Sequence, residues 1–486
     1  MIIAVDIGTS LTKAACFDEH GTILAEAGEQ SRLVHYPDGR VEQDLDDVVS
    51  TVATVVRDVN ARTAQRPRAV ALTGQGDGLW LRDADGRPVR PPISWMDGRA
   101  AGLVEQWQDT GISHRVYERT GNGLFPGAQA PLLAYLRDTE PASLEQAVVA
   151  GYCVDSVLHV LTGEISVDAS DASVPFLNAG TRCYDQEALA ACGLTDHQRL
   201  LPKPAQPRQL FQLDATGAEL LDLPSGLPVT AGPFDLPACA IGGGIQQPGD
   251  GLLTVGTTLA CQVLTDVNAT REHAEPSGMW LCTPDENRLL HGMPAMVGTA
   301  GLDWILDLFG LTIADLGALL DESPPGAHNV SALPFLAPGG ERAPFVDPRA
   351  SGQLSGVRLG TTRSDVVRAV CESVAYAARH CFDAAGLEGR LVACGGGTRS
   401  QPWAQVFADI LGRTLHIPDD PGMGARGAAI TAARALGDSV DVQEWTGVNR
   451  RVTPNPRVRD HYDAGYRRYR DTLEVTRELW RSTAGG

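Results

Sequence analysis

The residues with the clearest chemical potential lie in a short motif near the start of the chain, Asp6-Ile-Gly8-Thr9-Ser10, followed by Lys13. A Gly-Thr-Ser turn exposes backbone N–H groups and two hydroxyls, which are the donors that a phosphate chain needs. A carboxylate at the end of the preceding strand is the hard oxygen ligand that Mg²⁺ prefers. The alternative is a plain hairpin in which Asp6 only ends a strand, and the motif alone leaves both open.

Glycine-rich motifs also occur in the second half of the sequence. Gly256-Thr257-Thr258 repeats the first turn without an acid, and Gly395–Gly397 stands between an apolar stretch and a predicted helix over 401–411. Such glycines let a ligand approach the backbone closely, although purely structural turns look the same. A literal G-x-G-x-x-G at 422–427 lies late in the chain and does not open a βαβ unit. It therefore favours a close approach of helix to helix or ligand over a dinucleotide fingerprint.

Asp235 is the only charged residue between Asp222 and Asp250, and it lies in an apolar turn containing glycine and proline. A carboxylate in that setting can take a proton from a substrate hydroxyl. An aspartate before Leu-Pro-Ala is also a good helix N-cap. From the residues alone, the cap is favoured.

The elements that would position these residues alternate between strand and helix, which indicates α/β layers. The strands are expected at 2–7, 12–17, 69–73 and 78–82, and the helices at 145–161, 363–382 and 462–480. Thr361 or Thr362 would cap the long helix, and the aromatic stripe of the last helix would pack on its domain. The similarity between Ala4–Leu11 and Leu253–Leu259 indicates two related domains that meet near residues 242–251.

Composition excludes several classes of protein. The 486 residues carry 60 acidic and 40 basic side chains, a net charge of −20, which argues against nucleic acid or an anionic membrane as partner. No apolar run approaches the length of a membrane span. The N-terminus does not fit a signal peptide, and the 10 scattered cysteines read as reduced thiols, so we expect a cytoplasmic protein. Lys13 is one of only two lysines in the sequence.

Taken together and in this order, the motifs resemble the FGGY family of carbohydrate kinases, within the actin, hexokinase and heat-shock ATPase superfamily. The resemblance covers about residues 2–440 and includes the stretches 161–168 and 335–344. It implies an α/β fold with two RNase-H-like (actin-like ATPase) domains around a central cleft. The implied domains are 1–245 for sugar, 246–450 for ATP, and a C-terminal helical extension, 451–486, on the second domain.

The resemblance also implies roles for individual residues. Asp235 becomes the general base, and Asp6 and Asp235 would organise Mg²⁺. The residues expected to bind the substrate are Gln75, Gly76, Asp77, Trp95, Asp97, Arg99 and Asp235. Those expected to bind ATP and its phosphates are Gly8, Thr9, Ser10, Lys13, Gly256, Thr257, Thr258, Gly301, Gly396, Gly397, Ser400, Gly424 and Ala425.

The implied function is transfer of the γ-phosphoryl group of ATP to a primary hydroxyl of a small open-chain polyol or ketose. Xylulokinases usually carry Met-His after the glutamine that Gln75 matches, whereas Gln75-Gly-Asp-Gly78 looks more like erythritol and L-xylulose kinases. The partner would be a small-molecule sugar or polyol, with a homodimer left open. The alternatives are a catalytically silent sugar or nucleotide sensor on the same fold and, further off, a Rossmann dehydrogenase.

Overall fold

The structure is a computed structural model that describes residues 1–269, 276–337, 339–418 and 422–482. Pro338, inside the stretch 335–344 singled out above, and the last four residues of the expected extension lie outside the described residues. Among the described residues, no helix is both long and apolar enough to cross a membrane.

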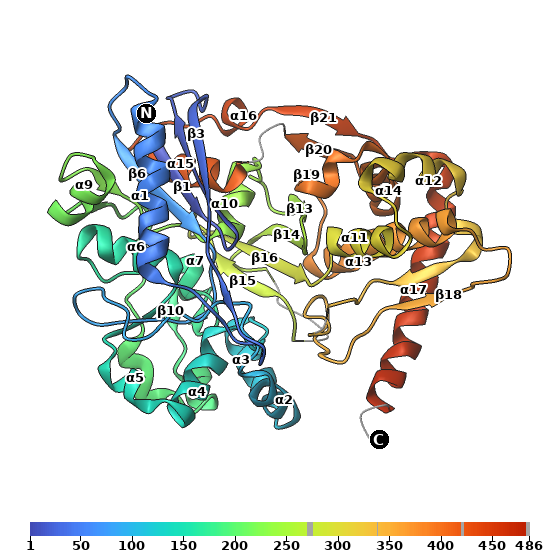
Figure 1. Cartoon of the computed structure of the whole chain (residues 1–486), viewed down its shortest axis with the longest axis horizontal. Coiled ribbons are helices and arrows are strands. Elements are labelled where there is room, and N and C mark those ends of the chain that lie inside the picture. Colours follow the sequence, from blue (N-terminus) through green and yellow to red (C-terminus); the bar gives the residue numbers. More distant parts are fainter. Residues whose placement is uncertain (270–275, 338, 419–421, 483–486) are drawn as a thin grey trace.

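Two β-sheets with the same strand arrangement form the framework, one from each half of the chain (Figure 1). In the first sheet, β1 (Ile2–Ile7) pairs antiparallel with β2 (Leu11–Phe17) and parallel with β6 (Ala69–Gly74). In the second, β13 (Gly251–Val255) pairs antiparallel with β14 (Leu259–Asp266) and parallel with β19 (Leu391–Cys394). The duplication predicted from the two Gly-Thr motifs is therefore confirmed as a duplicated α/β topology.

The other strands extend the two sheets or form small separate ladders. The first sheet is completed by β3 (Ile23–Gln30), β11 (Phe211–Gln212) and β12 (Pro228–Val229), and the second by β15 (Met279–Cys282), β16 (Arg288–Ala295), β20 (Leu415–Pro418) and β21 (Val448–Val452). The small ladders pair β4 (Val34–His35) with β5 (Val41–Glu42), β7 (Trp80–Arg82) with β8 (Val149–Gly151), β9 (Leu177–Asn178) with β10 (Cys183–Tyr184), and β17 (Ser331–Leu333) with β18 (Gln353–Ser355).

Apolar side chains alternate between the two faces of the first sheet, and helices cover both faces. Ile3 and Val5 face α1 (Leu45–Ala61) and α6 (Cys153–Thr162), whereas Ile2 and Ala4 face α15 (Met423–Ala435). Helix α15 falls within the expected second domain, 246–450, yet its buried face packs on the first sheet. The expected domain limits therefore stay a prediction.

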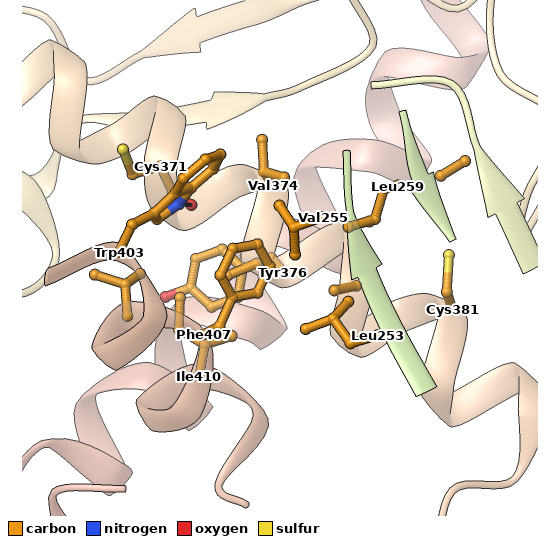
Figure 2. Close-up of a cluster of buried hydrophobic side chains, with 14 of the residues drawn as sticks. Leu253, Val255, Leu259, Cys371, Val374, Tyr376, Cys381, Trp403, Phe407 and Ile410 are labelled. Atoms are coloured by element: carbon orange, nitrogen blue, oxygen red, sulfur yellow. Dashed lines mark hydrogen bonds between the residues drawn. The ribbon is translucent and has the colours of Figure 1, made fainter. Parts of the chain in front are cut away.

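The second sheet has the same layered construction. Figure 2 shows Leu253, Val255 and Leu259 facing side chains of α13 (Arg363–Ala385) and α14 (Gln401–Leu411). On the opposite face, Leu252 and Val392 contact α10 (Asp235–Gly242). Each sheet is thus covered on its inner side by one helix, α15 or α10.

Helices α10 and α15 pack directly against each other and join the two halves. A Cβ atom at Gly427 would lie 1.8 Å from the Ala238 carbonyl oxygen, and one at Gly242 would lie 2.0 Å from that of Met423. Only glycine permits this approach at both positions. The helix-to-helix interpretation of the G-x-G-x-x-G motif is confirmed at Gly427.

The remaining helices lie around the two sheets. They are α2 (Ala101–Asp109), α3 (Ile112–Thr120), α4 (Gln129–Thr139), α5 (Pro141–Gln146), α7 (Ala169–Ala172), α8 (Gln186–Ala191), α9 (Ala215–Leu221), α11 (Thr299–Leu308), α12 (Leu316–Glu322), α16 (Val442–Trp445) and α17 (Arg459–Ser482), with 3₁₀ turns at Thr195–Leu200, Ile313–Asp315, Ala327–Asn329, Gly396–Arg399 and Pro456–Val458.

The expected helix over 145–161 is wrong, because the buried strand β8 separates α5 from α6. Strand β8 pairs with β7. A buried ion pair between Arg82, on β7, and Asp155, on α6, holds β7 beside that helix. The strand expected at 78–82 begins two residues late, at Trp80. Helical periodicity misled here since a three-residue buried strand has too few residues to show its own period.

The two long helices agree with the sequence. Thr362, not Thr361, caps α13, and its hydroxyl forms a capping box with Asp365. On α17 the stripe of Tyr462, Tyr466 and Tyr469 is buried in the core of the second half. The predicted packing role of that stripe is confirmed.

Candidate active site

Three parallel strands bring the acidic motifs of the first half to one edge of the first sheet. Strands β1, β6 and β12 run in the same direction. Asp6 lies near the end of β1, Gln75–Asp77 follow β6, and Asp235 follows β12 after five residues. The Gln75 N–H donates to the Ile7 carbonyl at 2.9 Å, which ties the first two motifs together. Residues far apart in the sequence meet because the carboxyl ends of parallel strands share one edge.

The second sheet presents its two glycine motifs in the same way. Gly256–Thr258 follow β13 and Gly395–Gly397 follow the neighbouring parallel strand β19, where a Cβ at Gly395 would lie 2.4 Å from the Val255 carbonyl oxygen. The Thr257 side chain is exposed, while its carbonyl accepts from the Gly298 N–H at 2.9 Å. The turn is thus anchored through its backbone, and its hydroxyl stays accessible.

Three further residues expected at the ATP site differ in accessibility. Gly396 is exposed and has open space around it, which suits a ligand. Gly301 is buried in α11, where its position faces Val297. The Ser400 hydroxyl caps α14 by accepting from the Trp403 N–H at 3.4 Å. The structure thus gives structural roles to Gly301 and Ser400, and their contact with ATP stays a prediction.

The Thr9 hydroxyl is bound by two residues expected to contact the substrate. Trp95 Nε1 donates to Thr9 Oγ1 at 2.9 Å, and Thr9 Oγ1 donates to Gln75 Oε1 at 3.0 Å. Because the hydroxyl has a single hydrogen, it has no donor left for a phosphate in this arrangement. Ser10, which is exposed, and the backbone N–H groups of the turn remain available for that task.

Asp97 and Arg99 use their polar groups within the protein. Asp97 Oδ2 accepts from the Val41 N–H at 2.6 Å and Asp97 Oδ1 from Arg99 Nε at 2.8 Å, while Arg99 Nη2 also binds Glu42 Oε1 at 2.7 Å. Arg90 completes this buried ionic cluster through the same Glu42 oxygen. The geometry gives both residues a positioning role, and direct substrate contact stays a prediction.

Carboxyl groups crowd the region between Gly76 and α10. Asp77 is 7% exposed and Asp171, on α7, is 1% exposed. Neither Asp171 oxygen, nor Oδ1 of Asp77 or of Asp235, has a hydrogen-bond partner among the described residues. Burial raises the pKa of Asp77 to about 7, and burial followed by repulsion from Asp6 raises the pKa of Asp235 well above its usual value.

Asp235 is the first residue of α10, and Phe234 occupies the N-cap position without a side-chain cap bond. The sequence interpretation of Asp235 as the N-cap is therefore wrong by one position. Instead, the Phe234 ring packs on Gly76, where a Cβ would lie 2.4 Å from the ring and 2.7 Å from Asp171 Oδ1. Asp235 Oδ1, freed from capping, stays without a partner among the described residues.

Arg342 comes to this cluster from the second half of the chain. Its guanidinium lies over the rings of Trp95 and Phe125, at 5.4 and 5.0 Å from their centroids, and its Nε donates to the Pro294 carbonyl at 2.9 Å. Its charge opposes the rise in the pKa of Asp77 and of Asp235. We assigned no role to Arg342, Asp171 or Phe125 from the sequence. The sequence does contain a feature that could have drawn attention to Arg342, because the charged pair Glu341-Arg342 interrupts an apolar stretch rich in glycine and proline.

The start of α15 lies against Asp6. A Cβ at Gly424 would lie 2.4 Å from Asp6 Oδ2, and Ala425 is buried with Ile2 and Ala4 on the first sheet. A cavity of about 280 Å³ next to these residues is lined by Lys13, Gly422 and Ala425 among others. Gly424 thus faces the first phosphate motif, and its contact with ATP, like that of Ala425, stays a prediction.

Asp6 and Asp235 carry the carboxylate oxygens that Mg²⁺ prefers, and their role as a magnesium site stays a prediction. Burial raises the pKa of Asp6, with Lys13 opposing the rise, and the two carboxylates repel each other. A divalent cation near both would relieve that repulsion. No cluster of three or more His, Cys, Asp or Glu side chains suited to a metal occurs in the part of the chain that the structure describes. Mg²⁺ bound by one or two carboxylates usually keeps water and phosphate oxygens as its other ligands.

Each half of the chain thus carries an α/β sheet with a Gly-Thr turn after its first strand, β1 or β13. The chain belongs to the FGGY family of carbohydrate kinases: residues 1–242 match the N-terminal domain of that family and residues 253–436 its C-terminal domain. It is thus a phosphotransferase that acts on an alcohol group and uses ATP as its phosphoryl donor.

Individual relatives cover the whole chain. It is 30% identical over 515 residues to an erythritol kinase of Brucella abortus (strain 2308), covering 100% of this chain and 98% of the relative. It is 26% identical to a probable L-xylulose kinase of Pasteurella multocida (strain Pm70), covering 98% and 99%. The fold matches the crystal structure of a xylulose kinase from Lactobacillus acidophilus with a TM-score of 0.92, at 23% identity and 99% coverage of each chain. The predicted two-domain, actin-like ATPase fold is confirmed.

Proposed function

We propose that this protein transfers the γ-phosphoryl group of ATP to a primary hydroxyl of a small, neutral, open-chain polyol or ketose, and that Asp235 is the general base. One observation carries the proposal. Asp235 stands at the start of α10 with Oδ1 unpartnered among the described residues, and it shares its surroundings with Asp6, Asp77 and Arg342.

In the proposed reaction, Asp235 accepts the proton of the acceptor hydroxyl as that oxygen bonds to the γ-phosphorus. The bond from that phosphorus to the bridging oxygen breaks, and ADP leaves with the electron pair. The raised pKa makes ionised Asp235 a stronger base, and Arg342 opposes part of the rise. Mg²⁺, facing Asp6 and Asp235, would supply charge neutralisation at the phosphates.

The charges of the site favour a neutral acceptor. Burial raises the pKa of Asp171, and the nearby Asp235 and Asp77 carboxylates raise it further. The Arg342 guanidinium opposes the rise in the pKa of Asp77 and of Asp235. An acceptor carboxylate, as in an aldonate, would add negative charge to an acidic pocket. The relatives named erythritol kinase and probable L-xylulose kinase support a polyol or ketose of four or five carbons.

The rival function is a catalytically silent sensor of sugar or nucleotide. Retention of Asp6, Asp77 and Asp235 favours an active kinase. The test is ADP release from Mg-ATP across four- to six-carbon polyols, ketoses and aldonates. We expect one neutral acceptor to stimulate release strongly, whereas binding of ATP and sugars with no stimulation by any of them would indicate the sensor. The cytoplasmic location and a homodimer stay predictions.

A further inference from the structure

The guanidinium of Arg342 has a hydrogen bond and two ring contacts, but its two terminal nitrogens have no hydrogen-bond partner among the described residues. Nε donates to the Pro294 carbonyl, and the plane lies over Trp95 and Phe125, two rings of the first half. The neighbouring Glu341 does not take up the charge through a hydrogen bond. Its Oε1 accepts instead from the backbone N–H groups of Met296, Arg342 and Ala343. Neither Nη atom has a hydrogen bond to protein within the described ranges.

Asp77 is prepared in a complementary way. Its backbone adopts a left-handed conformation, with φ of 55°, which is uncommon for non-glycine residues and which aspartate adopts more readily than most. The side chain is 7% exposed, and Oδ1 has no partner among the described residues. A buried polar oxygen without a partner is costly, so a ligand that donates to it would be stabilised.

Trp95 connects Arg342 with Asp77. The Arg342 guanidinium lies over the Trp95 ring, and a Cβ at Gly78, the residue after Asp77, would lie 3.1 Å from the Trp95 backbone nitrogen. Each of the two charged groups opposes the other's pKa shift. A guanidinium only donates hydrogen bonds and a carboxylate only accepts them. A pair of adjacent hydroxyls offers both partners, because each has oxygen lone pairs and a hydrogen. We infer that Arg342 and Asp77 together bind two adjacent hydroxyls of the acceptor, Arg342 donating to their oxygens and Asp77 accepting their hydrogens.

This inference rests on the proposed function and adds a residue from the second half to the acceptor site. It follows that the acceptor site is complete only when both halves contribute. Arg342 thereby selects acceptors with a vicinal diol at the position it reaches. A purely structural Arg342 would affect stability without distinguishing acceptors that differ by one hydroxyl.

The experiment measures acceptor and ATP kinetics for wild type, Arg342→Gln and Arg342→Lys with the best acceptor and with analogues that each lack one hydroxyl. For Arg342→Gln, the acceptor KM should rise roughly 10- to 100-fold, the size of a hydrogen bond to a charged group. The ATP KM should change by less than about twofold, because Arg342 lies over Trp95 among the acceptor motifs. Loss of the charge also lets the pKa of Asp235 rise further, so kcat should fall for all acceptors alike without changing the discrimination between them. Arg342→Lys keeps the charge but lacks the paired N–H donors of the guanidinium, so its acceptor KM should lie between those of wild type and Arg342→Gln.

The decisive result is the loss of discrimination. Wild type should reject one analogue strongly, and Arg342→Gln should treat that analogue and the full acceptor nearly alike. Equal discrimination in both proteins would overturn the inference. Arg349→Gln is the matched control, because Arg349 lies on the same loop, is half-exposed and pairs with Asp347. Should Arg342→Gln fail to fold, Arg342→Lys carries the same comparison.

Calorimetric binding of the acceptor separates this inference from the proposed function. Should wild type bind an acceptor without phosphorylating it, the proposed function would fail. The ratio of Kd values for the acceptor and its analogue would then decide the role of Arg342: a ratio that Arg342→Gln abolishes supports the inference, and an unchanged ratio refutes it.

Discussion

The indole nitrogen of Trp95 donates to the Thr9 hydroxyl at 2.9 Å, and the same hydroxyl donates to Gln75 at 3.0 Å. Thr9 belongs to the turn that the sequence assigned to phosphate, whereas Trp95 and Gln75 belong to the motifs assigned to the substrate. The Thr9 hydroxyl therefore connects the predicted phosphate turn with the predicted acceptor site through hydrogen bonds. Arg342 stacks over the same Trp95 ring, so the link extends to the second half of the chain.

Replacing Thr9 by Val keeps the shape and removes the hydroxyl. Trp95 Nε1 and Gln75 would each lose a partner, which costs about 1–3 kcal/mol where the group stays buried. We expect the acceptor KM to rise roughly tenfold, and more than the ATP KM, in steady-state kinetics. Thr9→Ser, which keeps the hydroxyl, is the control, and a Thr9→Val enzyme with wild-type acceptor KM would show that the link is unimportant.

Gly427 tests the joint between α10 and α15. A methyl group there would lie 1.8 Å from the Ala238 carbonyl, so Gly427→Ala must push the helices apart. Overpacking of this kind costs typically 1–3 kcal/mol, and thermal melting should show a clearly lower Tm. Gly102→Ala is the control. It lies in α2 with open space around it and should stabilise the protein by roughly 0.5–1 kcal/mol, as expected for a helical glycine. Equal Tm values for both variants would contradict the close approach.

Asp77 should make stability fall as the pH rises. Its pKa of about 7 in the folded protein exceeds that of an unfolded aspartate, near 4, so the folded state binds more protons between these values. The contribution of Asp77 is present below about pH 4 and lost as the pH rises through about 7. Asp77→Asn removes this dependence.

Urea unfolding at several pH values checks this prediction. As the pH rises from about 4 to 7, wild type should lose stability relative to Asp77→Asn. The difference between their free energies of unfolding should change by up to a few kcal/mol. A constant difference between the two proteins would mean that Asp77 titrates normally. A difference of opposite slope would mean that Arg342 outweighs burial at this carboxyl.

The sequence predicted much of the fold because its motifs follow strands. Strands β1, β2 and β6 and helices α13, α14 and α17 lie where the patterns indicate. The interval 145–161 failed since β8 is defined by a partner, β7, some 70 residues earlier, and no local pattern reports such pairing.

The site was predictable in part for a related reason. Asp6 lies near the end of a strand, Gln75, Asp77 and Asp235 follow strands, and parallel strands bring their carboxyl ends together. Arg342 was not identified because its role depends on a contact across the two halves with Trp95 and Phe125. In the sequence, Asp97 and Arg99 looked free to bind a substrate. The structure shows that Asp97 accepts a hydrogen bond from the Val41 N–H and that Arg99 donates one to Glu42.

The most direct test of the account is acceptor-dependent ADP release by Asp235→Asn, with ATP binding measured by calorimetry and folding by thermal melting. Asparagine keeps the size of the side chain and cannot accept the proton, so the rate should fall by about 10²–10⁴-fold while the Kd for ATP measured without Mg²⁺ stays near wild type. Asp222→Asn, an exposed change at the left-handed residue that ends α9, should retain full activity. A folded Asp235→Asn protein that binds ATP and phosphorylates the acceptor within tenfold of wild type would contradict the assignment of Asp235 as the base.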